Sequence, residues 1–424
     1  MTRGPWIKPL LGLAALAVMA SPAIAQPAQK PDQCDVWAQS PEAWPEIEKT
    51  LRDNYAYLDR VQDLDSLLKK ARQSAADVST SAQMGTLVEK LGYAFRDGHF
   101  HVSPVVGPER AWIPSASDFW VVARDNRWIV ADVKQGSEAH KEGIRPGWEL
   151  RRMDGESVSK LAREALLAVV ASPSAKQFEY AINTVLAGRL GQARRFVFVN
   201  GQVQREVDLP PALQSFGPRP DELASVTRHG TAVRIRFNNS LGKNDLIRAF
   251  DRLMLENKDA RALILDFRDT PGGGNTTVAR AIIGHFVDEP KVYQIHRNMY
   301  EEQVYGVRRQ YAEYVFPRGE RFEGKVVALG GYWTGSVGEA LMQAMDKTAG
   351  VHTIGTGLGD LLGTLNRSSV GDGCLSISLA WDKLFASDGT PREDWLPATT
   401  LPSGDTAPDG SDPSLEAAQA LLAE

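Results

Sequence analysis

Residues 324–350 read GKVVALGGYWTGSVGEALMQAMDKTAG. The apolar run Val326–Leu329 predicts a buried strand, and Gly330 and Gly331 allow the chain to turn before an amphipathic helix begins near Ser336. A serine at such a turn lies beside the unpaired N–H groups of the first helical turn, where the helix dipole favours negative charge. This environment suits a nucleophile whose attack creates an oxyanion. Ser336 could also be a simple helix N-cap, and this segment alone does not separate the two roles.

A second glycine-rich turn favours the chemical role. The apolar run Ala262–Phe267 predicts another strand, and the three consecutive glycines Gly272–Gly274 follow it before the next helix. Consecutive glycines let backbone N–H groups approach a ligand closely. A phosphate-binding loop needs Gly-Lys-Ser/Thr or a spaced Gly-x-Gly-x-x-Gly, and neither occurs here. A turn that helps to bind an oxyanion beside Ser336 fits better.

Strands and helices alternate over residues 225–401, which is typical of a parallel α/β core. Earlier in the chain, apolar residues recur at helical spacing over 42–93 and predict a small bundle of helices. Residues 117–210 favour strands, with a helix over 161–190 and a hairpin at Asn200-Gly201. The predicted division is a signal peptide at 1–25, a helical domain at 26–105, a β-rich domain at 106–215, an α/β core at 216–403 and a C-terminal tail at 404–424.

The first residues have the pattern of a secretory signal. Arg3 and Lys8 precede the apolar run Leu10–Ala20, and Ala23-Ile24-Ala25 fits a small-x-small cleavage site. The apolar run is too short to span a bilayer as a helix. The sequence therefore predicts export to the periplasm or the extracellular space. In such a compartment Cys34 and Cys374 could form a disulfide, although two free thiols are an open alternative because the sequence gives no distance.

Composition excludes several classes of protein. The chain has 424 residues, a formal net charge of −5 and no run rich in Lys and Arg, which argues against a nucleic-acid partner. Two cysteines exclude a disulfide-dense scaffold and a zinc site made only of cysteines. No segment after the leader is long and apolar enough for stable membrane insertion. We expect no cofactor and no metal, and the sequence does not indicate the oligomeric state.

The two core motifs and their order resemble the C-terminal processing (tail-specific) serine peptidase family. Its D-x-R-x-x-x-G-G turn and its T-x-S-x-x-E signature are carried here by Asp266, Arg268, Gly272 and Gly273, and by Thr334, Ser336 and Glu339. Residues 119–155 look like the PDZ-like domain of that family, except that Trp148 replaces an acidic residue. The resemblance implies an α/β fold class with an N-terminal helical bundle, a PDZ-like β-rich domain and a crotonase-like peptidase core.

The branch of the family determines which residue would activate the serine. One branch uses a lysine about twenty-five residues after the serine, where this chain has Asp360 and Leu361. The tricorn-like branch uses a histidine and a glutamate instead. The resemblance to that branch implies Ser336 as nucleophile, His99 as general base and Glu393 as the acid that orients the histidine.

The resemblance also implies oxyanion donors, and it leaves alternatives open. The donors would be the N–H of Val337 and one N–H from Gly272 or Gly273. His101 could be the base instead, because residues two apart in a strand face the same way. A metal bound by the two histidines would lack an evident third ligand. We expect a structural role for Glu339.

The sequence thus predicts an exported serine peptidase that cuts unfolded or extended polypeptides through an acyl-enzyme. Two rival functions remain on the same fold. One is a non-catalytic protein that binds a peptide or an apolar ligand, and the other is an esterase or amidase with the same residues. The PDZ-like domain would bind an extended peptide by strand addition, or it would only pack against the core.

Overall fold

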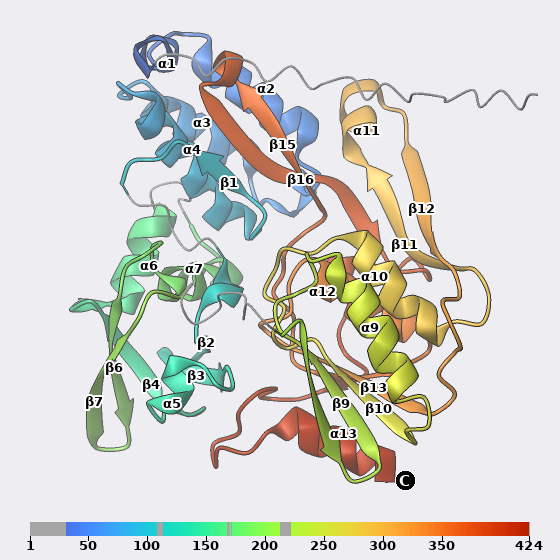
Figure 1. Ribbon diagram of the computed structural model, residues 1–424. Helices are drawn as coiled ribbons and strands as arrows, with labels where there is room; N and C mark the ends of the chain where they lie inside the picture. The colour runs from blue at the N-terminus through green and yellow to red at the C-terminus, as the bar shows by residue number, and fades with distance from the viewer. Residues whose placement is uncertain (1–30, 108–112, 168–169, 171, 213–221, 424) are drawn as a thin grey trace, which may run out of the picture.

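The computed structural model describes residues 31–107, 113–167, 170, 172–212 and 222–423. The predicted signal peptide at residues 1–25 lies outside these ranges. Within them, no helix is both long enough and apolar enough to cross a membrane. Figure 1 shows the N-terminal helices above a β-rich domain, with the α/β core beside both.

The N-terminal helices do not form a separate core. They are α1 (Pro31–Ala38), α2 (Ala43–Asn54), α3 (Leu64–Ala75) and α4 (Ser81–Phe95). Their buried apolar side chains pack with those of β15 (Thr364–Val370) and β16 (Leu375–Phe385) from the C-terminal half. The short strand β1 (His101–Ser103) also pairs antiparallel with β16. The predicted helical bundle therefore shares its hydrophobic core with distant strands, and this core extends beyond the boundary predicted at residue 105.

The β-rich domain is an antiparallel sheet with helices packed on it. Its strand order is β2-β3-β4-β6-β7, from β2 (Phe119–Arg124), β3 (Arg127–Val133), β4 (Glu149–Met153), β6 (Arg194–Asn200) and β7 (Val203–Leu209), while β5 (Glu156–Ser157) pairs with β4. The short helix α5 (Glu138–Lys141) follows β3. β6 and β7 form the hairpin predicted at Asn200-Gly201. The resemblance of this domain to a PDZ domain stays a prediction.

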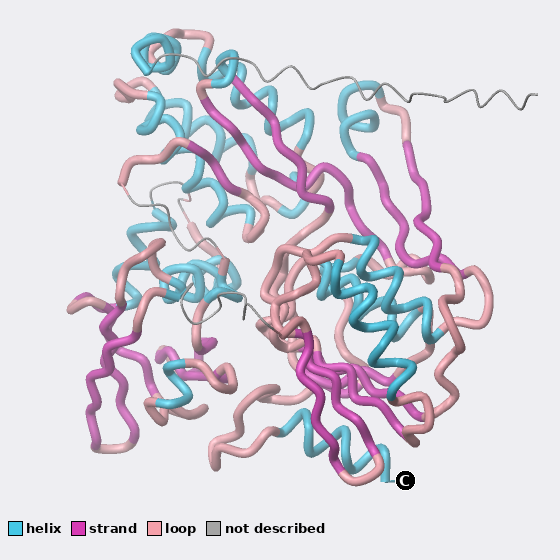
Figure 2. Tube along the Cα trace, viewed as in Figure 1, coloured by secondary structure: helices cyan, strands magenta, loops and turns pink. Residues whose placement is uncertain are grey.

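The single helix predicted over 161–190 is two helices in the structure. α6 (Val158–Leu167) and α7 (Ala175–Ala187) pack against each other, and Figure 2 shows them as separate coils. Pro173 removes a backbone donor, and Ser174 begins α7 with a capping box that also uses Gln177. These local signals outweigh the helical spacing of apolar residues on either side.

The α/β core is a six-stranded sheet covered on both faces. Its strand order is β17-β14-β13-β10-β9-β8, from β17 (Thr399–Thr400), β14 (His352–Gly355), β13 (Lys325–Gly330), β10 (Ala262–Asp266), β9 (Ala232–Phe237) and β8 (Ala224–His229). All neighbours are parallel except β8 and β9. One face packs on α9 (Asp245–Glu256), α10 (Thr276–Ile283) and α12 (Val337–Lys347). The parallel core predicted from the alternation of strands and helices is confirmed.

The other face of this sheet is covered by the C-terminus. Residues 404–424 were expected to be a tail, but α13 (Pro413–Ala423) packs on the sheet with Ala418 fully buried. Both guanidinium NH groups of Arg268 donate to Asp412 just before this helix, at 2.7 and 2.9 Å. The Arg268 side chain also donates to Asp266. The D-x-R part of the first motif therefore holds the C-terminal segment on the core.

A second sheet joins the core to the N-terminal helices. β11 (Lys291–Asn298), α11 (Met299–Tyr305) and β12 (Arg309–Val315) form an arm, and the strand order is β1-β16-β11-β12 with β15 on β16. Figure 1 shows the arm standing away from the six-stranded sheet. The sequence analysis predicted no strands here. Their partners lie far apart in the sequence, so local patterns carry little information about the pairing.

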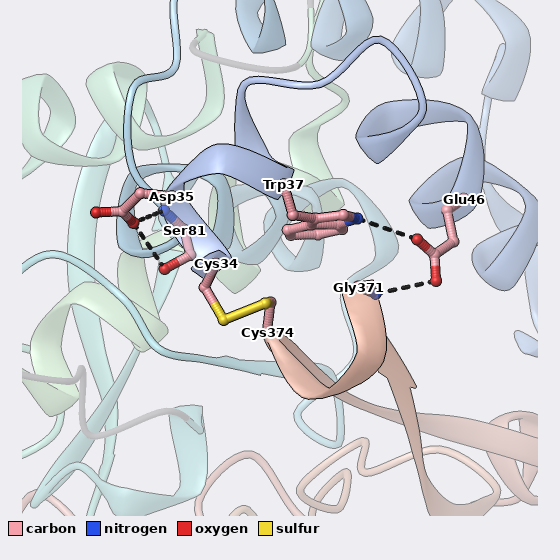
Figure 3. The surroundings of a disulfide bond; sticks show 7 residues. All are labelled: Cys34, Asp35, Trp37, Glu46, Ser81, Gly371 and Cys374. Carbon is pink, nitrogen blue, oxygen red and sulfur yellow. Dashed lines mark hydrogen bonds between the residues drawn. A yellow bond between two sulfur atoms is a disulfide. The ribbon is translucent and has the colours of Figure 1, made fainter. Parts of the chain in front are cut away.

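Cys34 and Cys374 form a disulfide between α1 and the turn that joins β15 to β16, with 5.1 Å between their Cα atoms (Figure 3). The bond closes a loop of 340 residues. Near it, Glu46 accepts from the Trp37 indole and from the Gly371 N–H, so the same junction is also tied by hydrogen bonds. The structure thus resolves the two alternatives that the sequence left open in favour of the disulfide.

We expect the Cys34→Ser/Cys374→Ser double variant to have a free energy of unfolding lower by about 2–5 kcal/mol, because a cross-link over a long loop restricts the unfolded chain. Urea unfolding of the variant and the wild type measures the difference. Adding a reductant should destabilise the wild type and leave the variant unchanged. Equal unfolding midpoints for the oxidised wild type and the variant would show that the bond does not stabilise the fold.

Candidate active site

Ser336 lies at the turn between β13 and α12, as the sequence predicted. Its backbone has φ 56° and ψ −114°, a combination that is costly for a residue with a side chain. The following N–H groups begin α12, so the positive end of the helix dipole faces this position. Gly335, just before it, is packed too closely for a side chain, since a Cβ there would lie 2.4 Å from the Pro271 carbonyl oxygen. The serine is held in a strained turn, and its hydroxyl is half-buried.

His99 contacts this hydroxyl. Its Nε2 lies 3.1 Å from Oγ of Ser336, and its Nδ1 lies 2.6 Å from the backbone carbonyl oxygen of Leu362. A carbonyl oxygen can only accept, so Nδ1 carries the proton and the lone pair of Nε2 faces the serine. In this arrangement the Ser336 hydroxyl donates to Nε2. That is the geometry of a nucleophile beside its general base.

Burial determines the protonation state of this histidine. Loss of solvation is the main cause that lowers the pKa of His99 to about 4; the Leu362 carbonyl acts in the opposite direction, and the nearby Arg392 guanidinium adds to the lowering. His99 is 6% exposed. The imidazole is therefore neutral over the whole physiological pH range and can accept a proton.

His101 does not occupy the position of the base. It begins β1 and pairs with Ser378 on β16. His99 lies in the turn before this strand, so the two-residue alternation from which the alternative base was argued does not apply to the two histidines. Among the described residues, no group of three or more His, Cys, Asp or Glu side chains is arranged to hold a metal ion.

Glu393 does not contact His99 in the structure, which differs from the predicted contact. The Leu362 carbonyl occupies the Nδ1 position instead. Within the short helix η5 (Arg392–Asp394), Arg392 points to the serine loop: its guanidinium donates to the Gln294 side chain at 2.9 Å and approaches the Ser336 carbonyl oxygen at 3.5 Å. Glu393 has a buried carboxylate oxygen without a hydrogen-bond partner, and burial raises its pKa. The orienting role predicted for Glu393 therefore stays an untested alternative to the Leu362 carbonyl.

We expect Glu393→Gln to change kcat/KM by less than about threefold, because the Leu362 carbonyl already orients the imidazole. Loss of a group needed by the general base would reduce kcat/KM by much more than about threefold. Steady-state kinetics on a peptide substrate measure the change. A loss of about 100-fold or more would instead assign the orienting role to Glu393 and indicate a rearranged active state.

The predicted oxyanion donors lie in two adjoining loops. The Gly335 N–H donates to the Thr270 carbonyl at 2.8 Å, which joins the two loops. A Cβ on Gly274 would lie 2.5 Å from Cβ of Val337, so the triple-glycine turn packs directly against the start of α12. Gly273 has φ 77°, a conformation that favours glycine. The loop that carries Gly272 and Gly273 thus packs against the segment that carries Ser336 and Val337, and the role of these glycines and of Val337 as oxyanion donors stays a prediction.

Lysines lie elsewhere. Lys347 contacts Asp346 and Asp388, and Lys383 contacts Asp59. Neither lysine is recorded in contact with Ser336 or His99. The sequence disfavours the family's Ser–Lys arrangement, because Asp360 and Leu361 occupy the position of the lysine. The contacts of Lys347 and Lys383 do not indicate such an arrangement either.

A cavity of about 340 Å³ lies at the junction of the three parts of the molecule, and its lining includes residues that contact Ser336 or His99. The core contributes Glu339, Leu362 and Arg392 to its lining, among others, while Arg96 comes from the helical part and Tyr180 from the β-rich domain. Buried contacts fasten the β-rich domain to the core beside it: the Trp333 indole donates to the Ser117 carbonyl at 2.7 Å, and Trp120 stacks on Tyr332 with ring centroids 4.5 Å apart.

Comparison with known proteins agrees with this architecture. Residues 231–393 match the model of peptidase family S41. The chain carries a peptidase family S41 domain. This confirms the predicted C-terminal processing peptidase family and a serine-type peptidase. None of the curated protein sequences matches the chain.

Two solved structures share the fold over most of the chain. Mature CPAF in complex with lactacystin is 14% identical, with a TM-score of 0.59, over 87% of this chain and 94% of that one. The photosystem II D1 C-terminal processing protease is 13% identical, with a TM-score of 0.53, over 87% of this chain and 92% of that one. These similarities confirm the predicted α/β fold class with its peptidase core. The assignment to the tricorn-like branch stays a prediction.

Several groups at the site were missed by the sequence analysis. The Leu362 carbonyl is a backbone group and leaves no signature in side-chain patterns. Arg392 stood next to a residue that was singled out, yet nothing in the sequence said which of the two faces the serine. Asp97, which accepts from the His99 N–H at 2.9 Å, was given no role by the sequence analysis.

Proposed function

We propose that this S41 peptidase hydrolyses peptide bonds in unfolded or extended polypeptides through an acyl-enzyme formed on Ser336. The observation that carries the proposal is the pair of His99 contacts, Nε2 on the Ser336 hydroxyl at 3.1 Å and Nδ1 on the Leu362 carbonyl at 2.6 Å. They supply a nucleophile, a neutral base and a fixed tautomer, which together are the minimum for acyl transfer.

The reaction runs in two halves. Oγ of Ser336 attacks the carbonyl carbon of the scissile bond while Nε2 of His99 takes its proton. The C–N bond breaks, His99 gives the proton to the leaving amine, and the acyl group stays on Ser336. Water then attacks the ester carbon, His99 takes a proton from the water and returns it to Oγ, and the carboxylic acid product leaves. N–H groups of Val337 and of Gly272 or Gly273 stabilise the oxyanion in both halves.

An extended substrate is favoured by the position of the pair. Ser336 is half-buried and His99 is 6% exposed, so the surface of a folded protein cannot reach both. A single extended chain can enter the adjoining cavity, which is lined by residues from all three parts of the molecule. Binding of that chain to the β-rich domain by strand addition is part of the proposal.

The experiment incubates the wild type and the Ser336→Ala variant with the same protein in unfolded and native forms, and identifies products by mass spectrometry. We expect cleavage of the unfolded form by the wild type alone. No cleavage by the wild type between about pH 5 and 9 would overturn the proposal and favour a binding protein. Hydrolysis of simple esters without cleavage of any polypeptide would favour an esterase.

We also propose that the protein is exported, on the basis of its leader and the disulfide between Cys34 and Cys374. Expression of the full chain and intact-mass analysis of the periplasmic or culture fraction test this. The expected product begins at Gln26 and carries the disulfide. A full-length, reduced chain in the cytoplasm would contradict export.

A further inference from the structure

One short loop connects the two members of the catalytic pair. Residues 360–362 lie in the segment that follows β14, and they contact both the Ser336 side and the His99 side of the site. The Leu362 carbonyl in this loop is the group that fixes the His99 tautomer. The position of this loop therefore determines where Nε2 points.

A buried glutamate holds the loop to the serine. Glu339 lies on the first turn of α12 and is 4% exposed. Its carboxylate accepts from the N–H of Ser336 at 2.7 Å, of Asp360 at 2.8 Å and of Leu361 at 3.2 Å. One side chain thus fixes the backbone of the nucleophile and two of the three loop residues.

A buried aspartate holds the same loop to the histidine. Asp97 is fully buried, and one of its oxygens accepts from the N–H of His99 at 2.9 Å and of Leu362 at 3.2 Å. Its other oxygen accepts from the Tyr55 hydroxyl at 3.1 Å, which anchors the carboxylate in the helical part. The donor and the acceptor of the His99–Leu362 hydrogen bond are both tied to this one group.

We propose that Glu339 and Asp97 are positioning residues whose ionised carboxylates hold the Leu362 carbonyl in place and so keep Nε2 of His99 directed at Ser336. The inference rests on the proposed function and extends it to a pair of groups outside the reacting atoms. It also replaces the purely structural role that the sequence suggested for Glu339.

The inference predicts a pH dependence that does not come from the histidine. Burial raises the pKa of Asp97 to about 7 and of Glu339 to about 8. The groups that face Glu339 are Arg392, which lowers its pKa, and Asp360, which raises it; those that face Asp97 are Tyr55 and Asp360. Protonation removes the charge and turns one oxygen into a donor, which weakens the hydrogen bonds from the backbone N–H groups, so kcat should rise as the pH increases through this range. His99, with a pKa of about 4, is already neutral there.

The test compares Glu339→Gln and Asp97→Asn with a matched control, Glu46→Gln, which removes a carboxylate that also accepts a loop N–H but lies near the disulfide. We expect kcat to fall about 10- to 100-fold in each site variant with KM changed less than about twofold, because a small misplacement of a catalytic group is costly. The control should keep the wild-type kcat.

The site variants should also lose the step in the pH profile near neutrality. Wild-type kcat in both, or a lower kcat with the step unchanged, would overturn the proposal.

Two further measurements do not depend on the folding of the site variants, and the second does not depend on activity either. The wild-type kcat must itself rise through about pH 7–8, so a flat profile overturns the inference. Proton NMR of histidine-labelled protein should show a downfield Nδ1–H signal of His99 in the wild type and in Ser336→Ala. That signal should broaden by exchange as the pH is lowered through the same range. If the signal broadens as expected although the wild type shows no cleavage, the proposed function fails and the positioning role stands. A signal that stays sharp overturns the positioning role.

Discussion

The Ser336→Ala variant is expected to lose hydrolysis of an unfolded polypeptide by about 10⁴-fold or more, because the acyl-enzyme cannot form without Oγ. Binding should persist, since the cavity and its lining do not involve the hydroxyl. The measurement is the initial rate of product formation by the variant and the wild type at equal concentration, with thermal unfolding as a check on folding. The substitution removes only Oγ, and alanine, like serine, has a Cβ, so the cost of the strained backbone conformation stays similar.

An activity within about tenfold of the wild type in that variant would show that another group is the nucleophile. Water activated directly by His99 would then be the first alternative to examine. A large loss of activity together with a lowered unfolding temperature would be ambiguous for alanine alone. Ser336→Cys resolves this case, because a thiol keeps the size and reacts with thiol reagents if the base is in place.

The His99→Ala variant is expected to lose about 10²–10⁴-fold in kcat, the usual contribution of a positioned general base. His101→Ala is its matched control, since it removes the other imidazole of the same segment and should reduce kcat by less than about threefold. The difference follows from the structure, in which Nε2 of His99 contacts Ser336 while His101 begins β1. Steady-state kinetics of both variants on one peptide substrate provide the comparison.

Equal losses in the two histidine variants would mean that neither side chain is the specific base. A larger loss for His101→Ala would restore the alternative that the sequence left open. The His99→Gln variant offers a further check, because an amide oxygen can accept from Ser336 but cannot take up its proton.

The residues that could be predicted are those with local signals. Ser336 lies between a buried strand and an amphipathic helix, and the glycines around it predict the turn. His99 was identified through its position after the N-terminal helices in the family resemblance. The chemical role of both residues was predicted only with the second glycine-rich turn and the family resemblance.

Other parts of the site depend on contacts between distant segments. The Leu362 carbonyl reaches His99 across 263 residues of sequence, and a backbone oxygen has no residue preference that a pattern could reveal. Glu393 and Arg392 are neighbours in a short helical turn, and only the packing determines which of them faces Ser336. The contacts of Glu339 could not be predicted either, because its partners are backbone N–H groups.

The fold shows the same division. The parallel core and the hairpin at Asn200-Gly201 follow from periodicity and turn chemistry, which act over a few residues. The sheet that contains β11 and β12, and the packing of α13 on the core, involve pairings set by the complete tertiary structure. The break between α6 and α7 was visible in Pro173 and Ser174, but the regular apolar spacing on both sides outweighed it.

The most direct test of the central claim is covalent labelling of the native protein with a fluorophosphonate, which reacts with serines that an adjacent base activates. The protein is digested after labelling, and the modified peptide is identified by mass spectrometry. We predict one adduct, on Ser336, formed much more slowly in His99→Ala and absent in Ser336→Ala. Labelling at another residue, or equal rates in the wild type and His99→Ala, would contradict a Ser336 nucleophile activated by His99.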